Sequence, residues 1–148
     1  MLLIESPHNE RFKKLLKLST DNKFRRKSKL FIIEGLKEIR AALEHNYELE
    51  EVYIDDKYKT AFPEKEFDQV SVTILKHDLF SRLVYREDAS YILAVLKEPV
   101  LDLSQIQLPE NPLIIILENI EKPGNLGALL RTCDAVGADA VILSQDHH

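Results

Sequence analysis

Residues 113–143 read LIIILENIEKPGNLGALLRTCDAVGADAVIL, and this stretch decides the fold of the second part of the chain. Its first five residues form a continuous leucine and isoleucine run, typical of a strand buried on both faces of a parallel sheet. A glycine-containing loop (118–124) follows, and then a helical pattern that begins at Asn125 or the next residue. Gly137 is placed as a C-terminal cap, and residues 140–143 form a returning strand. The pattern predicts a βαβ unit whose loop lies where open α/β sheets bind ligands.

Taken alone, each polar or glycine position in this segment has a purely structural interpretation. Asn125 suits a helix N-cap, because asparagine is among the best capping residues. Arg131 lies off the predicted buried stripe and could pair with Asp134, three residues on. Gly124 and Gly127 could serve only as turn and packing glycines. The predicted buried stripe consists of Leu126, Leu129, Leu130, Cys133 and Val136.

Residues 1–97 predict a small self-contained domain, and residues 98–112 a linker that contains three prolines. Strands alternate with helices in the first part, which indicates an α/β sandwich. We expect strands at 30–33, 52–54, 72–75 and 91–96. We expect three helices. The first begins at Ser6-Pro7, with Phe12, Leu15 and Leu16 inward. The second begins at Leu36, with Ile39, Ala42 and Leu43 inward and Asn46 near its end, and the third begins at His77, with Leu79, Phe80 and Leu83 inward. A helix-like stretch at 60–67 is interrupted by Pro63.

The charge is distributed unevenly. The net charge is −5, yet the segment from Arg11 to Lys29 holds nine basic residues and one acid, so it carries +8 and the rest carries −13. A localised cationic patch on an acidic body attracts phosphate while limiting indiscriminate binding. A solvated basic helix face without a partner is the alternative. The candidate RNA contacts are Lys13, Lys17, Arg25, Arg26, Lys27 and Lys29.

Composition excludes several classes of protein. Hydrophobic residues make up 45% and charged residues 30% of the chain, the balance of a globular protein. The longest apolar run, 113–117, is far shorter than a membrane-spanning helix needs, and the N-terminus lacks signal-peptide features. A single cysteine, Cys133, cannot form an intramolecular disulfide, so we expect a cytoplasmic location. We expect no metal site, since two terminal histidines, His147 and His148, are too few ligands for a closed one.

The combination NxxxPxNLGAxxRTxxAxG, from Asn119 to Gly137, closely resembles the first signature motif of the SpoU/TrmH family of RNA 2'-O-ribose methyltransferases. Alanine is more usual in that family where Cys133 stands. The earlier part is similar to the family's N-terminal substrate-binding domain, with its L30e-like fold, at Ser6-Pro7-His8-Asn9, at the Arg25-Arg26-Lys27 run and at 31–35. Residues 91–95 align with that domain's last strand, although the Pro-Gln-Gly often found before it is absent.

The resemblance implies an L30e-like RNA-binding domain (1–97), followed after the linker by the first βαβ unit of a knotted, Rossmann-like SPOUT domain (113–148). It implies methyl transfer from S-adenosylmethionine to a ribose 2'-hydroxyl of ribosomal or transfer RNA. Arg131 would act at the hydroxyl or the adjacent phosphate, and Asn125 would shape the pocket. The family's cofactor site lies in later motifs, so we expect it beyond residue 148, and we expect this chain to be truncated and inactive by itself. Family members are typically homodimers through the catalytic domain.

Two other functions stay open at this point. The first is a non-catalytic L30e-like RNA-binding module; Gly124 to Gly127 also mimics the GXXG clamp of KH domains, but that clamp lies between two helices rather than after a buried strand. The second is a nucleotide-binding enzyme, disfavoured because a third glycine and an acidic residue after the second strand are missing. We also expect the short βαβ unit alone to leave an apolar sheet face and open edges, and therefore to be unstable, disordered past Pro112 or self-associating.

Overall fold

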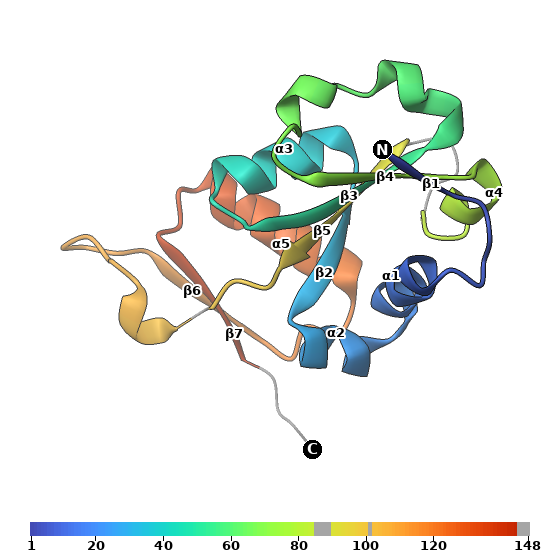
Figure 1. Cartoon of the computed structure of the whole chain (residues 1–148). Coiled ribbons are helices and arrows are strands. Elements are labelled where there is room, and N and C mark those ends of the chain that lie inside the picture. The colour runs from blue at the N-terminus through green and yellow to red at the C-terminus, as the bar shows by residue number, and fades with distance from the viewer. Residues whose placement is uncertain (85–89, 101, 145–148) are drawn as a thin grey trace. The chain divides into compact units, whose positions relative to one another are not determined.

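The computed structural model describes residues 1–84, 90–100 and 102–144, which divide into two compact units after Pro99. His147 and His148 lie outside the described residues. The first unit contains one mixed sheet with strand order β1-β4-β3-β5-β2 (Figure 1). Its strands are β1 (Leu2–Ile4), β2 (Leu30–Glu34), β3 (Leu49–Asp55), β4 (Ser71–Leu75) and β5 (Ile92–Lys97). Its helices are α1 (Glu10–Thr20), α2 (Asn22–Ser28), α3 (Leu36–Glu44) and α4 (His77–Phe80), with 3-10 turns η1 (Asp56–Ala61) and η2 (Glu64–Glu66).

The direction of the strands gathers several loops at one end of this sheet. β1, β4 and β3 run parallel, whereas β5 runs antiparallel to both β3 and β2. The carboxyl ends of β1, β2, β3 and β4 and the start of β5 therefore share one end. Gly35 makes the turn from β2 into α3 at a φ of 104°, and its N–H donates to the Ile92 carbonyl at 3.1 Å. Only glycine adopts that backbone conformation readily.

Each face of the sheet buries its own hydrophobic core. On one face α1 and α4 cover Tyr53, Leu75 and Leu93. On the other face α3, together with Phe62 and Phe67, covers Val52, Ile54 and Ala94. This arrangement confirms the predicted α/β sandwich for the first unit. The inward positions predicted for α3 and α4 include Ile39, Ala42, Leu79 and Phe80, which are all at most 8% exposed.

The start of α1 differs from the prediction. Asn9 is the N-cap, and its side-chain oxygen accepts the Arg11 N–H at 2.9 Å. Ser6 and Pro7 instead belong to a preceding turn, which the Asn9 N–H closes on the Ser6 carbonyl at 3.2 Å. Two good capping residues compete within four positions, and the second one begins the helix. The inward stripe shifts with it, because Leu18 is 2% exposed whereas Leu16 is only partly buried.

Two elements of the first unit were not predicted. β1 has only three residues and depends on pairing with β4. α2 was interpreted as a polar stretch, because its sequence NKFRRKS carries almost no apolar periodicity. The signal for this helix lies before it, since Asp21 accepts the N–H groups of Lys23 and Phe24 at 2.8 and 3.0 Å. An aspartate N-cap therefore marks the start of the helix.

The second unit contains η3 (Leu103–Gln105) and the predicted βαβ unit. β6 (Ile114–Glu118) and β7 (Ala140–Ser144) pair in parallel, and α5 (Pro123–Ala135) connects them. Gly137 has a φ of 66° and ends α5 as predicted. Its neighbour Ala138 donates to the Cys133 carbonyl at 2.9 Å, the pattern of a left-handed helix cap.

The predicted burial of this unit is wrong. Of the proposed α5 stripe, Cys133 alone is buried, and Leu129, Leu130 and Val136 are 37%, 42% and 57% exposed. In β6, Leu117 is 9% exposed, whereas Ile116 is 65% exposed. The apolar run was interpreted as a strand covered on both faces, but the described residues of the second unit do not by themselves supply layers that cover it. This exposure agrees with the expectation of an open apolar sheet face.

Substitution of Leu18 by alanine tests the corrected stripe of α1. Removing this buried side chain leaves a cavity among Phe12, Leu15 and Leu93, and we expect the free energy of unfolding to fall by about 2–5 kcal/mol. The matched variant Leu16→Ala, at a partly buried position one residue away, should cost distinctly less. Urea unfolding followed by circular dichroism measures both, and an equal loss in the two variants would contradict the assignment.

Candidate functional site

The chain leaves the second sheet at Asn119, directly after β6. Asn119 adopts a left-handed φ of 50°, which asparagine tolerates better than most residues, and its N–H donates to the Ser144 carbonyl at 2.9 Å. At the opposite end Asp139 and Leu113 exchange hydrogen bonds of 2.8 and 2.9 Å. Both ends of the parallel pair are thus closed, so the loop 119–122 begins at a fixed position.

Asn125 is not the N-cap of α5. The helix begins at Pro123, and Lys122 occupies the cap position without a side-chain cap bond. Proline suits the first helical position because its missing N–H has no partner there in any case. Asn125 therefore lies in the first turn with an exposed side chain, and its backbone N–H donates to the Lys122 carbonyl at 3.0 Å. The capping interpretation fails, which leaves the carboxamide available to a ligand.

Arg131 is exposed, and its Nε donates to the Gly127 carbonyl at 3.2 Å. Six residues separate it from Asn125, which corresponds to about 9 Å along the helix axis. The side chain nevertheless turns back toward the start of the helix, as long side chains on helices usually do. Among the described residues no ion pair joins Arg131 to Asp134, so the structural alternative for this arginine is not observed.

Gly124 and Gly127 border open space. A Cβ added to either would meet no atom within 4 Å among its surroundings. The interpretation as packing glycines therefore does not hold within the described residues. Both glycines lie on the first two turns of α5, close in sequence to Asn125, so this surface can be approached closely by a ligand or by further protein.

The described residues do not by themselves form a site for a sulfonium cofactor. The stretch from Glu121 to Asn125 is exposed, so it cannot enclose an adenosine group. Arg131 is a cation and would repel a sulfonium rather than hold it. No described group of three histidine, cysteine or acidic side chains is arranged to bind a metal ion.

Of the six predicted RNA-contacting cations, four contact other side chains or the backbone, and two are exposed without an acidic partner among the described residues. Lys13 pairs with Glu10 at 2.7 Å, and Lys29 pairs with Glu98 at 3.1 Å. Lys17 lies over the Phe24 ring, with its Nζ 5.9 Å from the ring centre. Arg26 and Lys27 are exposed, and no described acidic side chain pairs with either. Lys23 precedes them by three and four residues, so these three cations share one face of α2.

Arg25 has a structural role. Its Nη1 donates to the Leu18 carbonyl at 2.6 Å, and its Nη2 donates to Asn22. The bond to the Leu18 carbonyl ties α2 to the last turn of α1, and the bond to Asn22 lies within α2, so part of the predicted cationic patch serves the fold. Elsewhere Arg40 makes a forked contact with Glu66 at 2.6 and 2.9 Å, which lowers the pKa of that carboxyl and takes Arg40 out of the set of free cations.

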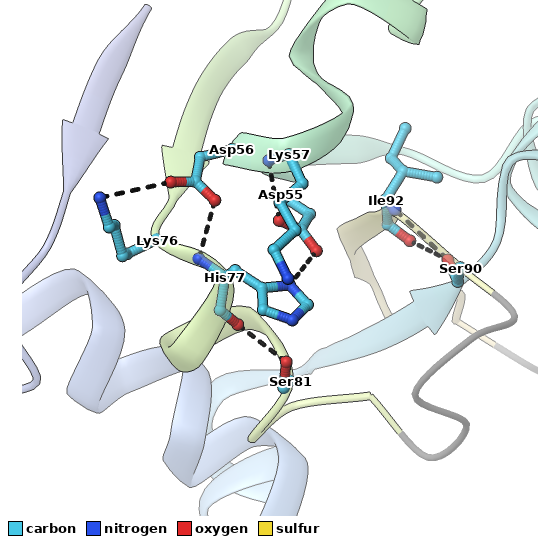
Figure 2. A network of polar contacts seen from close by, with 8 residues as sticks. All are labelled: Asp55, Asp56, Lys57, Lys76, His77, Ser81, Ser90 and Ile92. Atoms are coloured by element: carbon cyan, nitrogen blue, oxygen red, sulfur yellow. Dashed lines mark hydrogen bonds and ion pairs between the residues drawn. The ribbon is translucent and has the colours of Figure 1, made fainter.

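A polar network at the common end of the first sheet was missed by the sequence analysis (Figure 2). The carboxylate of Asp55, at the end of β3, is 3% exposed and lies 2.8 Å from Nδ1 of His77, which follows β4. Asp55 also accepts the Lys57 N–H at 3.0 Å, and Asp56 accepts the His77 N–H at 2.9 Å. Lys76 lies 3.7 Å from Asp56. The network fixes η1 and α4 to each other; an aspartate pair after a strand is its only signal in the sequence.

Comparison with known proteins identifies both parts of the chain. Residues 9–94 match the family described as the MRM3-like substrate binding domain, and residues 112–148 match the SpoU rRNA Methylase family. The chain belongs to the SpoU/TrmH family. A 23S rRNA (guanosine(2553)-2'-O)-methyltransferase of Bacillus subtilis is 32% identical over 97% of this SpoU-family chain and 54% of its own length.

Further relatives agree with this assignment. A 23S rRNA (uridine(2479)-2'-O)-methyltransferase of Streptomyces viridochromogenes is 26% identical over 92% of the chain and 49% of its own length. The crystal structure of an RNA 2'-O ribose methyltransferase matches with a TM-score of 0.78 at 30% identity, over 99% of the chain and 57% of that protein. The SpoU methyltransferase AviRb of S. viridochromogenes, in complex with the cofactor AdoMet, matches with a TM-score of 0.81 at 25% identity, over 94% and 55%. This SpoU-family chain spans about half the length of the curated relatives it matches.

Asp55→Ala tests the structural role of the network in this SpoU-family chain. The variant removes the partner of the His77 ring and the side-chain cap of η1, and we expect the free energy of unfolding to fall by about 2–4 kcal/mol. Asp68→Ala, at an exposed aspartate, is the control and should change stability little. Thermal and urea unfolding report the difference, and a wild-type stability for Asp55→Ala would refute the assigned role.

Proposed function

We propose that the protein containing this chain transfers a methyl group from S-adenosylmethionine to a ribose 2'-hydroxyl of RNA, with ribosomal RNA as the favoured substrate. The observation that carries the proposal is the motif from Asn119 to Gly137, placed after the parallel strand β6 with Asn125 and Arg131 exposed. Relatives that span the same two regions are 23S rRNA 2'-O-methyltransferases, and a related structure holds AdoMet.

In this proposal Arg131 and Asn125 act on the RNA. The reaction would form a bond from the methyl carbon to the 2'-oxygen and break the bond from that carbon to sulfur, which leaves as a thioether. The hydroxyl proton would pass to solvent or to a base outside the described residues. An arginine guanidinium carries a positive charge and a planar fork of donors, so Arg131 can stabilise the developing alkoxide or hold the adjacent phosphate in a forked contact. Asn125 can donate and accept hydrogen bonds through its carboxamide and so position the ribose. The cofactor would be held by residues other than those described.

The finer assignments belong to the same proposal. The first unit would be an L30e-like RNA-binding domain (1–97) and the second the beginning of a knotted catalytic domain (113–148), with assembly as a homodimer and a cytoplasmic location. No helix among the described residues is both long and apolar enough to cross a membrane. A non-catalytic RNA-binding module is not favoured, because the relatives over nearly the whole chain are named as methyltransferases.

Arg131→Ala tests the catalytic assignment in the whole gene product. We expect methyl transfer to fall at least a hundredfold, in line with the loss of one charge-stabilising donor, with RNA affinity nearly unchanged. Asp134→Ala, on the same helix, is the control and should retain activity. Incorporation of labelled methyl groups into total RNA, followed by nucleoside mapping, measures the effect and identifies the target. Normal turnover by Arg131→Ala would reject the role.

Charge reversal on α2 tests RNA binding. The double variant Arg26→Glu, Lys27→Glu removes two unpaired cations, and we expect weaker binding and a salt slope reduced by about 1–1.5, as two lost phosphate contacts on a single strand would give. The double variant Lys57→Glu, Lys59→Glu makes the same change in net charge on η1 and is the control. Fluorescence anisotropy with a labelled RNA at several salt concentrations distinguishes them. Equal losses in both variants would show a general charge effect and no local patch.

A further inference from the structure

A cavity of about 330 Å³ lies on the α1 face of the first sheet, at the carboxyl end of β2. Its size falls at the lower end of the roughly 300–1,000 Å³ range of small-molecule sites. The apolar lining includes the partly exposed Phe31, Ile32 and Leu83. Leu18 and Leu93 lie behind them and are only 2% and 1% exposed. The polar wall consists of Ser19, Arg25 and Glu34. Apolar walls with a few polar groups are typical of binding sites for small planar ligands.

The two charged side chains give this cavity a donor and an acceptor. Arg25 is oriented by its bonds to the Leu18 carbonyl and to Asn22, which leave further N–H groups of its fork for a ligand. The Glu34 carboxylate has two oxygens with about four acceptor positions, enough to serve a neighbour and a ligand at once. A ligand that fits both must carry acceptors on one edge and donors on another.

The surroundings of the cavity point to a nucleic-acid ligand. Arg25 lies on α2, whose outward face carries Lys23, Arg26 and Lys27. Arg25 is two positions from both Lys23 and Lys27 and therefore lies on the other side of this short helix, so a strand whose phosphates contact the cations would have to pass around α2 to place a base at Arg25. Proteins that read single-stranded RNA take unpaired bases into such pockets and hydrogen-bond their edges.

We propose that this cavity binds an unpaired guanine base of the RNA substrate, an inference that rests on the proposed action on RNA. Guanine carries the acceptors O6 and N7, which arginine contacts as a pair, and the adjacent donors N1–H and N2–H₂, which match the two oxygens of a carboxylate. Adenine, cytosine and uracil do not offer two adjacent donors. Arg25 and Glu34 would therefore select guanine, and the partly exposed side chains of Ile32 and Leu83 would contact the base.

Binding of two short RNAs by the chain tests the proposal. The probes are a labelled uridine hexamer with one central guanosine and the same hexamer with adenosine in its place. We expect the guanosine hexamer to bind about tenfold more tightly, which corresponds to one forked base contact. Glu34→Gln should abolish this preference, because a carboxamide no longer offers two acceptors.

Filling the cavity provides a matched pair of variants. Ser19 and Thr20 both donate to the Leu16 carbonyl at 2.8 Å, but of the two only Ser19 lines the cavity. Ser19→Phe should remove the guanosine preference, and Thr20→Phe should retain it; circular dichroism confirms that both are folded. Equal binding of the two hexamers by the wild type, or an unchanged preference in Ser19→Phe, overturns the guanine site. Salt-dependent binding of both hexamers would still support the proposed function, whereas no binding of either would reject both.

Discussion

Parallel pairing of β6 with β7 is the constraint on which the candidate site depends. Two parallel strands cannot be joined by a tight turn, so the chain must leave the end of β6 and return through a helix. The bond from the Asn119 N–H to the Ser144 carbonyl and the exchange between Leu113 and Asp139 fix both ends of this pair. In the loop after β6 and at the start of α5, most motif residues are polar or small, because this part of the second unit borders open space rather than a core.

The side chain of Arg131 leans toward the start of α5, although Arg131 lies eight positions after Pro123, the first residue of that helix. A side chain on a helix leans toward the N-terminus, and the bond from Nε to the Gly127 carbonyl holds the guanidinium in that direction. Glycine at 127 keeps the adjacent surface free of a side chain. Two motif residues are therefore in direct contact: Gly127 leaves the helix surface without a side chain, and its carbonyl binds the Arg131 side chain.

Much of the fold follows from periodicity, and the errors have identifiable physical causes. The strands 52–54, 72–75 and 91–96 are apolar enough to be recognised. Asn46, expected near the end of a helix, follows α3 with a left-handed backbone, at a φ of 60°. β1 and α2 escaped because a three-residue strand and a polar seven-residue helix carry no periodic signal of their own. Burial in β6 and α5 was predicted from hydrophobicity. Hydrophobicity indicates that a side chain is suited to a buried position, but it does not indicate whether the second unit itself contains the elements that would bury it. The Asp55–His77 pair joins residues 22 apart in sequence, and no local pattern predicts such a contact.

The cationic segment shows why residue type alone could not separate binding from structure. Nine basic residues between Arg11 and Lys29 look equivalent in the sequence, yet they perform different tasks in the fold. α2 has seven residues and buries no side chain fully, and Phe24 is its one side chain that packs, partly buried, against the core cluster described for this unit. Asp21 caps its start, and Arg25 ties it to the Leu18 carbonyl. Because these two polar anchors help to hold the helix, Arg26 and Lys27 can be exposed, and no acidic side chain that the structure describes pairs with either. One arginine of the basic run thus stabilises the helix that exposes its neighbours.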